Sequence, residues 1–383
     1  MSKLSEITKY FGPKFPRPYV AVLNSHQGKT PTRAMRWVLN TLSAVQRAIE
    51  NDHAVLTSVG MNTWEFLTWA VGEFGGKQII VCPLFSDQKP ESVARTILDD
   101  FELDSQRTAF LFMTDCSSKP KAFWRDRDQI VVHGADILYP VSIRAGGYIE
   151  ELIERAFLDE YHPKYIVPDF QTPHQKALTT RQYRFAGLLN EAFDKQEWNY
   201  LTHWTHATHE PWFNESRAEF YRALVYEEET YHHSALKSLL RILDGGKIYG
   251  SSEYLRQAHR AVSFTELSPA EAVRLVRWHK RKVRYTIEPY GIAIERDFAL
   301  AMGLQPVIYG DDKVYDSLEP SRKPYFQAQG KKADWRNEKE WRHIGDCDLT
   351  KIPPEKIIIL VYEPDEIEKV PPDLPFRVMA LCE

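Results

Sequence analysis

The first half of the chain alternates short apolar runs with longer segments in which apolar residues recur at helical spacing. The apolar runs are rich in β-branched and aromatic residues, as buried strands are. They lie at residues 19–23, 54–57, 78–82, 109–113, 136–139 and 165–167. Helical spacing at residues 32–50, 62–74 and 148–157 predicts the intervening helices. This regular alternation predicts a parallel sheet with covering helices, that is, a Rossmann-like α/β domain.

The second half mixes the same two patterns without regular alternation. It predicts helices at residues 216–226, 235–243 and 270–281, and strands at 261–264, 290–294, 306–309, 341–343 and 356–361. A smaller α+β domain is therefore expected to follow the first. Since 383 residues exceed the usual size of one hydrophobic core, we predict two domains, residues 1–190 and 191–383.

Composition narrows the class of protein. With 43% hydrophobic and 27% charged residues, the chain has the content of a folded domain rather than a disordered one. Its formal net charge of −4 gives no general attraction to nucleic acid or anionic lipid, so the basic run at residues 274–284 is interpreted as a solvated helix face. We expect no membrane partner, because no apolar run is long enough to cross a bilayer. A homo-oligomer is neither indicated nor excluded.

Cysteine and histidine positions give no support for a metal site. The four cysteines are widely spaced and form no CxxC pair, which argues against a zinc ribbon or a disulfide framework and favours a reducing, cytoplasmic location. His203, His206 and His209 follow one another at intervals of three, but on a helix the third would drift away from the first, and no fourth ligand is evident. We therefore predict no bound metal.

Two glycine-containing turns of the first domain are candidates for binding phosphate. Each follows a predicted strand and opens a predicted helix, where backbone N–H groups point towards an incoming anion. Arginines near the second turn would complete an anion-binding crevice. An ordinary βα turn is the competing interpretation of either glycine motif.

These two segments, at residues 57–83 and 125–156, resemble the Rossmann-like superfamily that includes DprA, the LOG proteins and the SLOG sensor domains. The resemblance covers roughly residues 15–175 and implies a nucleotide or another phosphorylated small molecule as ligand. Residues 144–150 match only part of the glycine-rich signature of LOG-type hydrolases, which favours sensing or binding over hydrolysis. The ligand site that the resemblance implies consists of Ser58, Gly60, Arg125, Arg144, Gly146 and Gly147.

Three segments of the second domain, at residues 230–248, 261–266 and 335–342, resemble in order the motif regions of ADP-ribosyltransferases of the bacterial toxin and defence type. The resemblance implies NAD as substrate and a catalytic Glu340 that stabilises the oxocarbenium-like transition state as nicotinamide departs. It implies His232 or His233 as the residue that grips the NAD ribose, and Ser263 and Thr265 as residues that shape the nicotinamide pocket. The acceptor, a protein or a nucleic acid, stays open.

Together the two resemblances imply a nucleotide-sensing domain that controls an NAD-cleaving effector, of a type used in bacterial stress or phage defence. The alternative is a non-catalytic nucleotide-binding regulator, in which Glu340 pairs structurally with an arginine such as Arg336 or Arg342. A third hypothesis is a nucleotide N-glycosidase that acts in the first domain.

Overall fold

The computed structural model forms two compact units, one of Met1–Thr180 with Glu210–His232 and one of Arg181–His209 with His233–Glu383. None of the helices in the described part of the chain combines the length and the apolar character needed to cross a membrane. The structure describes residues 8–114, 120–158, 164–174, 183–185, 189–190, 192–195, 197–227, 231–252, 255–256, 259–279, 284–329 and 335–383.

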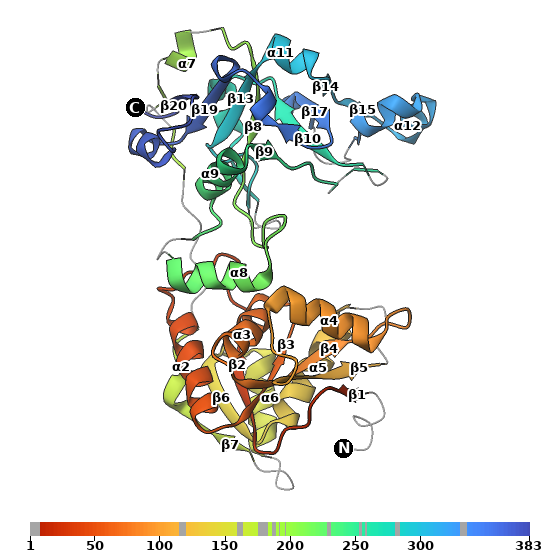
Figure 1. Cartoon of the computed structure of the whole chain (residues 1–383), viewed down its shortest axis with the longest axis vertical. Coiled ribbons are helices and arrows are strands. Elements are labelled where there is room, and N and C mark those ends of the chain that lie inside the picture. Colours follow the sequence, from red (N-terminus) through yellow and green to blue (C-terminus); the bar gives the residue numbers. More distant parts are fainter. Residues whose placement is uncertain are drawn as a thin grey trace. The chain divides into compact units, whose positions relative to one another are not determined.

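The first unit is built on one largely parallel sheet (Figure 1). In the described residues its seven strands lie in the order β1-β5-β4-β3-β2-β6-β7. Only β1 runs antiparallel to its neighbour, β5. The predicted Rossmann-like α/β fold is confirmed, with β1 as an edge strand that the sequence pattern missed. The strands are β1 (Thr8–Phe11), β2 (Tyr19–Asn24), β3 (Ala54–Ser58), β4 (Lys77–Pro83), β5 (Thr108–Met113), β6 (Ile137–Ser142) and β7 (Tyr165–Ile166).

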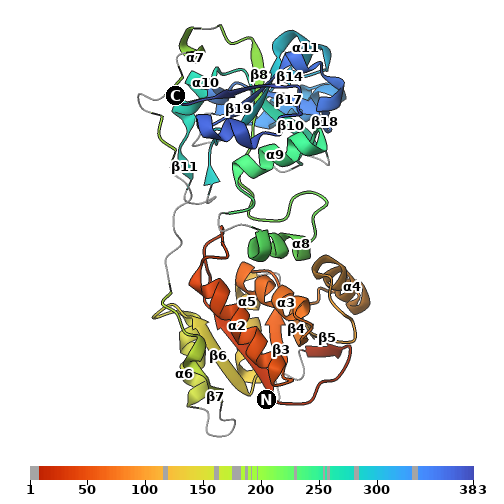
Figure 2. The same ribbon diagram turned by 60° about the vertical axis from the view of Figure 1, so that its left-hand side comes forward.

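Helices pack against both faces of this sheet (Figure 2). From β2 the chain moves outward through β3, β4 and β5, and then returns to the other side of β2 as β6. Right-handed crossovers therefore place α2, α3 and α4 on one face, and α5 and α6 on the other. Their bounds are α2 (Arg36–Glu50), α3 (Asn62–Glu73), α4 (Pro90–Phe101), α5 (Pro120–Gly134) and α6 (Tyr148–Phe157).

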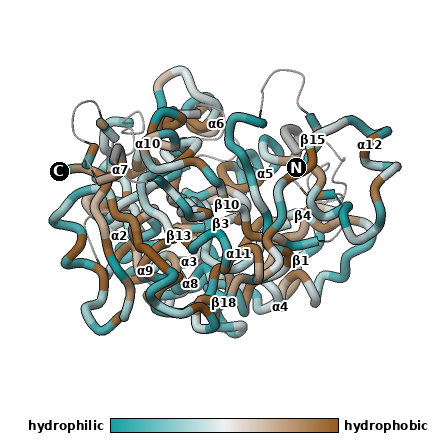
Figure 3. Tube along the Cα trace, turned by 90° about the horizontal axis from the view of Figure 1, so that it is seen from above, coloured by the Kyte–Doolittle hydropathy of each residue, from teal (hydrophilic) through white to brown (hydrophobic). Residues whose placement is uncertain are grey.

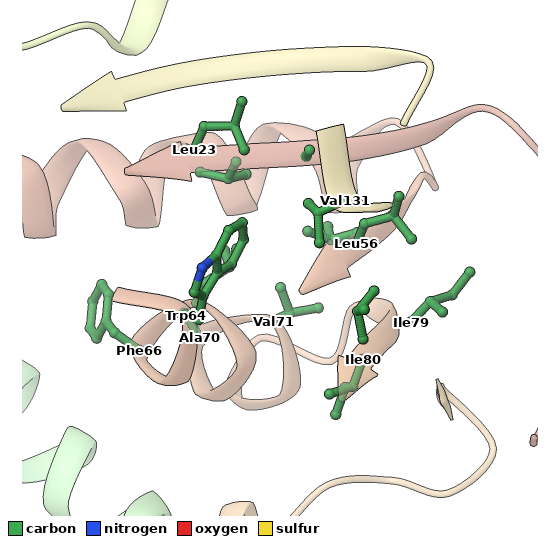
Figure 4. Close-up of a cluster of buried hydrophobic side chains, with 14 of the residues drawn as sticks. Leu23, Leu56, Trp64, Phe66, Ala70, Val71, Ile79, Ile80 and Val131 are labelled. Atoms are coloured by element: carbon green, nitrogen blue, oxygen red, sulfur yellow. The ribbon is translucent and has the colours of Figure 1, made fainter. Parts of the chain in front are cut away.

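The core of the first unit lies between the strands and these helices. Figure 4 shows side chains of the central strands, among them Leu23 and Leu56, near Trp64 and Val71 of α3. All four are at most 4% exposed. Hydrophobic and hydrophilic positions alternate along the trace, as expected of elements with one buried side (Figure 3).

Residues 210–232 belong to the first unit, although the predicted boundary near residue 190 would assign them to the second domain. They contain α8 (Arg217–Arg222), which continues as a π-helical turn at Ala223–Glu227. Tyr221 of α8 is buried and its ring packs against Phe66 and Trp69 of α3. The apolar stripe of this helix was visible in the sequence, but a stripe does not specify the core against which it packs.

The second unit contains a mostly antiparallel sheet, and its described strands lie in the order β14-β17-β10-β8-β13-β19-β20. Helix α9 (Ala235–Gly245) packs Leu239 and Leu243 against one face, while Trp204 and Leu360 contribute to a second core on the other. The predicted α+β character follows from this layering. The strands are β8 (Tyr200–Trp204), β10 (Ala261–Thr265), β13 (Gly291–Glu295), β14 (Gln305–Pro306), β17 (Glu340–Ile344), β19 (Ile357–Val361) and β20 (Arg377–Ala380).

The helix predicted at residues 270–281 extends only to Leu275 in the described residues, and the prediction is wrong beyond that point. A capping box between Ser268 and Glu271 starts α10 (Pro269–Ala272), but the hydroxyl of Thr286 then accepts a hydrogen bond from the backbone of Arg277 at 3.0 Å. The chain continues instead into a two-stranded ladder, so the described part of the basic run beyond Leu275 is not a helix face. The remaining short elements are α7 (Ala192–Lys195), α11 (Arg296–Ala301), α12 (Asp312–Ser317), β9 (Lys247–Ile248), β11 (Trp278–His279), β12 (Arg284–Tyr285), β15 (Ile308–Gly310), β16 (Phe326–Ala328) and β18 (Cys347–Asp348).

Candidate functional site

The topology of the first unit singles out one end of the sheet. Strand β2 pairs in parallel with β3 on one side and with β6 on the other. The chain reverses its direction of travel across the sheet here, and open α/β sheets bind ligands beyond the carboxyl ends of such strands. Both predicted glycine turns, after β3 and after β6, lie at this same edge. The loop after β2 joins them, and we call the region around it the switch-point site.

The floor of the switch-point site is polar and buried. The backbone N–H of Ser25 donates to the carbonyl of Ser142 at 2.9 Å, and the hydroxyl of Ser25 accepts from the backbone N–H of Arg144 at 2.9 Å. The amide nitrogen Nε2 of Gln27 lies 3.1 Å from Nδ1 of His174. The two bonds of Ser25 hold the loops after β2 and β6 together, and the contact of Gln27 joins the loop after β2 to the segment after β7. Ser25, Gln27 and Ser142 were absent from the sequence-based list, because a Ser or Gln after a strand is common in loops.

Basic side chains form the rim of the site. His26, Lys29 and Arg144 are exposed, and His174 is half-buried. Although the side chain is exposed, the surrounding protein partly desolvates the His26 ring and lowers its pKa, and the nearby basic side chains of Lys29, His174 and Arg144 lower it further. The charges around the loop after β2 thus disfavour protonation of His26. The rim is therefore electropositive and suited to an anion.

The start of helix α2 adds donors to this rim. The residue at its N-cap, Met35, provides no side-chain cap, and its first turn carries no acidic residue. The N-terminal N–H groups of such a helix attract negative charge. Helices α3 and α6 differ, because a glutamate in the first turn of each, Glu65 or Glu150, accepts a hydrogen bond from the N–H of the glycine that precedes the N-cap.

The predicted turn after β3 is closed by side chains of the protein. Ser58 is fully buried and its hydroxyl donates to the carbonyl of Val81 at 2.7 Å. Gly60 has a φ of +84°, and its N–H donates to Oε1 of Glu65 at 3.0 Å. A Cβ at Gly60 would lie 2.3 Å from the ring of Trp124. The group that lies close to this glycine is therefore the Trp124 ring of the protein itself.

The predicted turn after β6 is similar. The N–H of Gly146 donates to Oε2 of Glu150 at 2.6 Å, and Gly146 has a φ of +66°. A Cβ on Gly147 would lie 2.7 Å from the carbonyl oxygen of Arg144, so only glycine fits this bend. The side chain of Arg144 stays exposed at the rim. Of the predicted residues, it has the position best suited to meet a ligand.

The two arginines of the segment at residues 124–128 have different surroundings. Arg125 is exposed, and its guanidinium lies 5.1 Å from the centre of the Tyr148 ring. Arg127 is buried, pairs with Asp128 at 2.7 Å and donates to the carbonyl of Val59 at 3.3 Å. Burial raises the pKa of Asp128, and the charge of Arg127 opposes that rise. Arg127, which sequence reasoning did not select, supports the turn after β3.

In the second unit the structure brings together two of the predicted catalytic residues. Strands β10 and β17 pair so that Thr265 lies opposite Glu340 and Ser263 opposite Arg342. The hydroxyl of Ser263 donates to Oε1 of Glu340 at 2.8 Å, and Nε of Arg342 donates to the same oxygen at 2.9 Å. The Thr265 hydroxyl donates to the carbonyl of Glu338 at 2.5 Å. Arg342 thus holds the carboxylate that the prediction assigned to catalysis.

The two predicted histidines have other surroundings. His232 belongs to the first unit, where its ring lies 5.0 Å from that of Phe220. His233 is fully buried, and its carbonyl accepts from the backbone N–H of Thr208 at 3.1 Å. A different histidine, His203 on β8, places Nδ1 at 2.9 Å from the carbonyl oxygen of Ser263. Its segment was considered only as a helix, and a strand there was missed.

Among the residues that the structure describes, no group of three or more His, Cys, Asp or Glu side chains is arranged to hold a metal ion. His203, His206 and His209 do not share a helix, because His203 lies on β8.

Neither a protein-family model nor a curated protein sequence matches the chain. Two solved structures of DNA processing protein A are similar to part of it. That from Helicobacter pylori, described for its single-stranded DNA binding mode, shares 14% identity over 42% of this chain and 72% of its own, with a TM-score of 0.31. That from Streptococcus pneumoniae shares 22% identity over 43% of this chain and 58% of its own, also with a TM-score of 0.31. Both bear the name of DprA, one of the proteins in the superfamily that the sequence resembles.

Proposed function

We propose that the first unit binds a phosphate-bearing nucleotide at the switch-point site. The observation that carries this proposal is the grouping of His26, Lys29 and Arg144, which are all exposed around the loop after β2 and close enough to interact electrostatically. Such a grouping of positive charge beside an uncapped helix start suits a phosphate. Lys29 would contribute a point charge, and Arg144 a planar fork that can bond two phosphate oxygens.

The roles of the remaining residues follow from burial. Ser25 and Ser142 are buried and bonded to each other's loops, so they would hold the site in shape. Lys29 and Arg144 are exposed, so they would contribute to affinity and little to stability. Single-stranded DNA, which the Helicobacter pylori protein binds according to its description, is the competing ligand.

Calorimetric titration of the whole chain with ADP tests the proposal, with an oligodeoxythymidylate as the second titrant. We expect Arg144→Ala to weaken ADP binding about tenfold, the loss expected of one charge-assisted hydrogen bond. Arg155→Ala is the matched control, since Arg155 is an exposed arginine of α6 that pairs with Glu151. Absence of ADP binding, or equal affinity of Arg144→Ala and the wild type, would overturn the proposal. Tight binding of the oligonucleotide alone would assign the site to nucleic acid.

As a second candidate function, we propose that the second unit cleaves NAD at an ADP-ribosyltransferase-like site. The hydrogen bond from Ser263 to Glu340 favours it, because it would orient the carboxylate that faces the developing positive charge. The contact of Arg342 with the same oxygen favours the non-catalytic regulator, because it already neutralises that carboxylate. A role in bacterial stress or phage defence rests on the sequence resemblance alone.

Nicotinamide release from NAD by the purified chain separates these two interpretations. If the second unit cleaves NAD, Glu340→Gln should lower the rate by a factor on the order of 10² to 10³. The exposed Glu355 provides the control substitution, Glu355→Gln, which should leave the rate unchanged. A wild-type chain that releases no nicotinamide would support the regulator. Chromatography of the nucleotides after incubation also detects free base, the product that the N-glycosidase hypothesis requires.

A further inference from the structure

Residues 210–227 lie in the sequence between β8 and α9, which both belong to the second unit. They themselves belong to the first unit. We call these residues the inserted segment. They are held on the first unit by arginines. Arg217 pairs with Asp100 at 2.6 Å and with Glu65 at 3.2 Å, and Arg222 pairs with Glu73 at 3.0 Å.

One of these contacts reaches the edge of the sheet that carries the switch-point site. Glu65 lies in the first turn of α3, and its side chain is 13% exposed. One carboxylate oxygen accepts from the N–H of Gly60 at 3.0 Å, and the other accepts from Nε of Arg217 at 3.2 Å. Glu65 therefore joins the turn after β3 to the inserted segment.

A second contact joins the same turn of α3 to the loop after β2. Nδ2 of Asn62, the first residue of α3, donates to the carbonyl of Gly28 at 2.8 Å. Gly28 lies between His26 and Lys29, the basic residues of the rim. The hydroxyl of Tyr221 in the inserted segment lies 3.4 Å from the carbonyl of Asn62 and 3.4 Å from Oε2 of Glu65. The first turn of α3 thus bonds to the loop on one side and to the inserted segment on the other.

We propose that the first turn of α3, through Asn62 and Glu65, couples ligand binding at the switch-point site to the packing of the inserted segment on the rest of the first unit. The proposal rests on the proposed function, because it assumes a ligand at that site. A ligand that orders the loop after β2 fixes Gly28, and through Asn62 it fixes the turn that bonds Arg217 and Tyr221. Linkage is reciprocal, so release of the inserted segment must weaken ligand binding by the same factor.

The ion pair of Arg222 offers a matched control. It holds the same helix α8, but its partners Glu73 and Glu102 lie at the ends of α3 and α4, away from the first turn of α3. Loss of Arg222 should loosen the inserted segment without disturbing Glu65 directly. Comparison of Arg217→Ala with Arg222→Ala therefore separates coupling through Glu65 from general loosening of α8.

The experiment measures ADP affinity of the whole chain by calorimetry for the wild type and these two variants. We expect Arg217→Ala to weaken ADP binding about fivefold, a coupling of ordinary size, and Arg222→Ala to bind as the wild type does. Arg217→Lys, which keeps the charge, should fall between them and serves if Arg217→Ala does not fold. Equal affinities, or equal losses in both alanine variants, would overturn the coupling.

If the wild type fails to bind ADP, the proposed function is wrong. Amide hydrogen exchange of the same variants without ligand then still tests the coupling. In that case Arg217→Ala should still speed exchange in the loop at residues 26–34 by about tenfold, and Arg222→Ala should not. Equal exchange of the loop in both variants would overturn the inference as well.

Discussion

The N–H of Gly60 donates a hydrogen bond to the Oε1 oxygen of Glu65, at 3.0 Å. A glycine turn at a helix start offers its N–H groups to an anion, and here an internal carboxylate accepts one of them. Glu150 does the same for Gly146 at 2.6 Å. Of the starts of α2, α3 and α6, that of α2, with no acidic residue in its first turn, is therefore the most favourable to a ligand anion.

Substitution of Gly60 tests the packing of the turn after β3. Gly60→Ala combines a positive φ with a Cβ 2.3 Å from the Trp124 ring, whereas Gly75 has a φ of +69° and no heavy atom within 4 Å of its Cβ position. We expect Gly75→Ala to cost about 1 kcal/mol from backbone strain alone, and Gly60→Ala about 1–3 kcal/mol more. Urea unfolding of the two variants measures both costs. Equal costs would show that Trp124 does not fill this position.

Arg127 is expected to be essential for stability rather than for binding. Arg127→Met removes the partner of the buried Asp128, and breaking a buried pair typically costs about 3–5 kcal/mol. Burial raises the pKa of Asp128, so loss of Arg127 should raise it further, and the destabilisation should shrink as the pH falls and Asp128 becomes neutral. Denaturant titrations at pH 7 and pH 4.5 measure this. A cost below about 1 kcal/mol at pH 7 would contradict the buried pair.

His203 should make the stability of the second unit depend on pH. Burial lowers its pKa to about 4, below the value of about 6.5 for an unfolded histidine. The folded chain therefore favours the neutral ring, and this contribution is complete above pH 6.5 and is lost as the pH falls towards 4. Relative to His203→Gln, the wild type should lose about 1–3 kcal/mol between pH 7.5 and pH 4.5 in urea unfolding. Parallel pH profiles of the two proteins would refute the assignment.

The hydrophobic pattern was sufficient to predict most of the first sheet, because its central strands are buried on both faces and read as continuous apolar runs. It missed β1, whose sequence Thr8–Phe11 is short and only partly buried. It also missed β8, where His203 and Thr202 interrupt the apolar pattern. In both strands the pairing with neighbours, rather than local composition, determines the structure.

The candidate site was predictable in place but not in detail. The edge of the sheet follows from strand order, and Arg144 lies there as expected. Sequence could not distinguish Arg125 from Arg127, because residues two apart on a helix face different directions and either one could be the buried member. Nor could it show that Glu65 binds Gly60, since an acidic residue in a first helical turn is common whatever it contacts.

The most direct test of the account is the pKa of His26, measured by NMR titration of the imidazole signals with and without saturating ADP. Without ligand, burial and the neighbouring charges of Lys29, His174 and Arg144 should hold the pKa of His26 below its ordinary value. A phosphate bound at the rim would favour the protonated ring, so the pKa should rise by about one pH unit on addition of ADP. An unchanged pKa of His26 at saturating ADP would contradict the switch-point site.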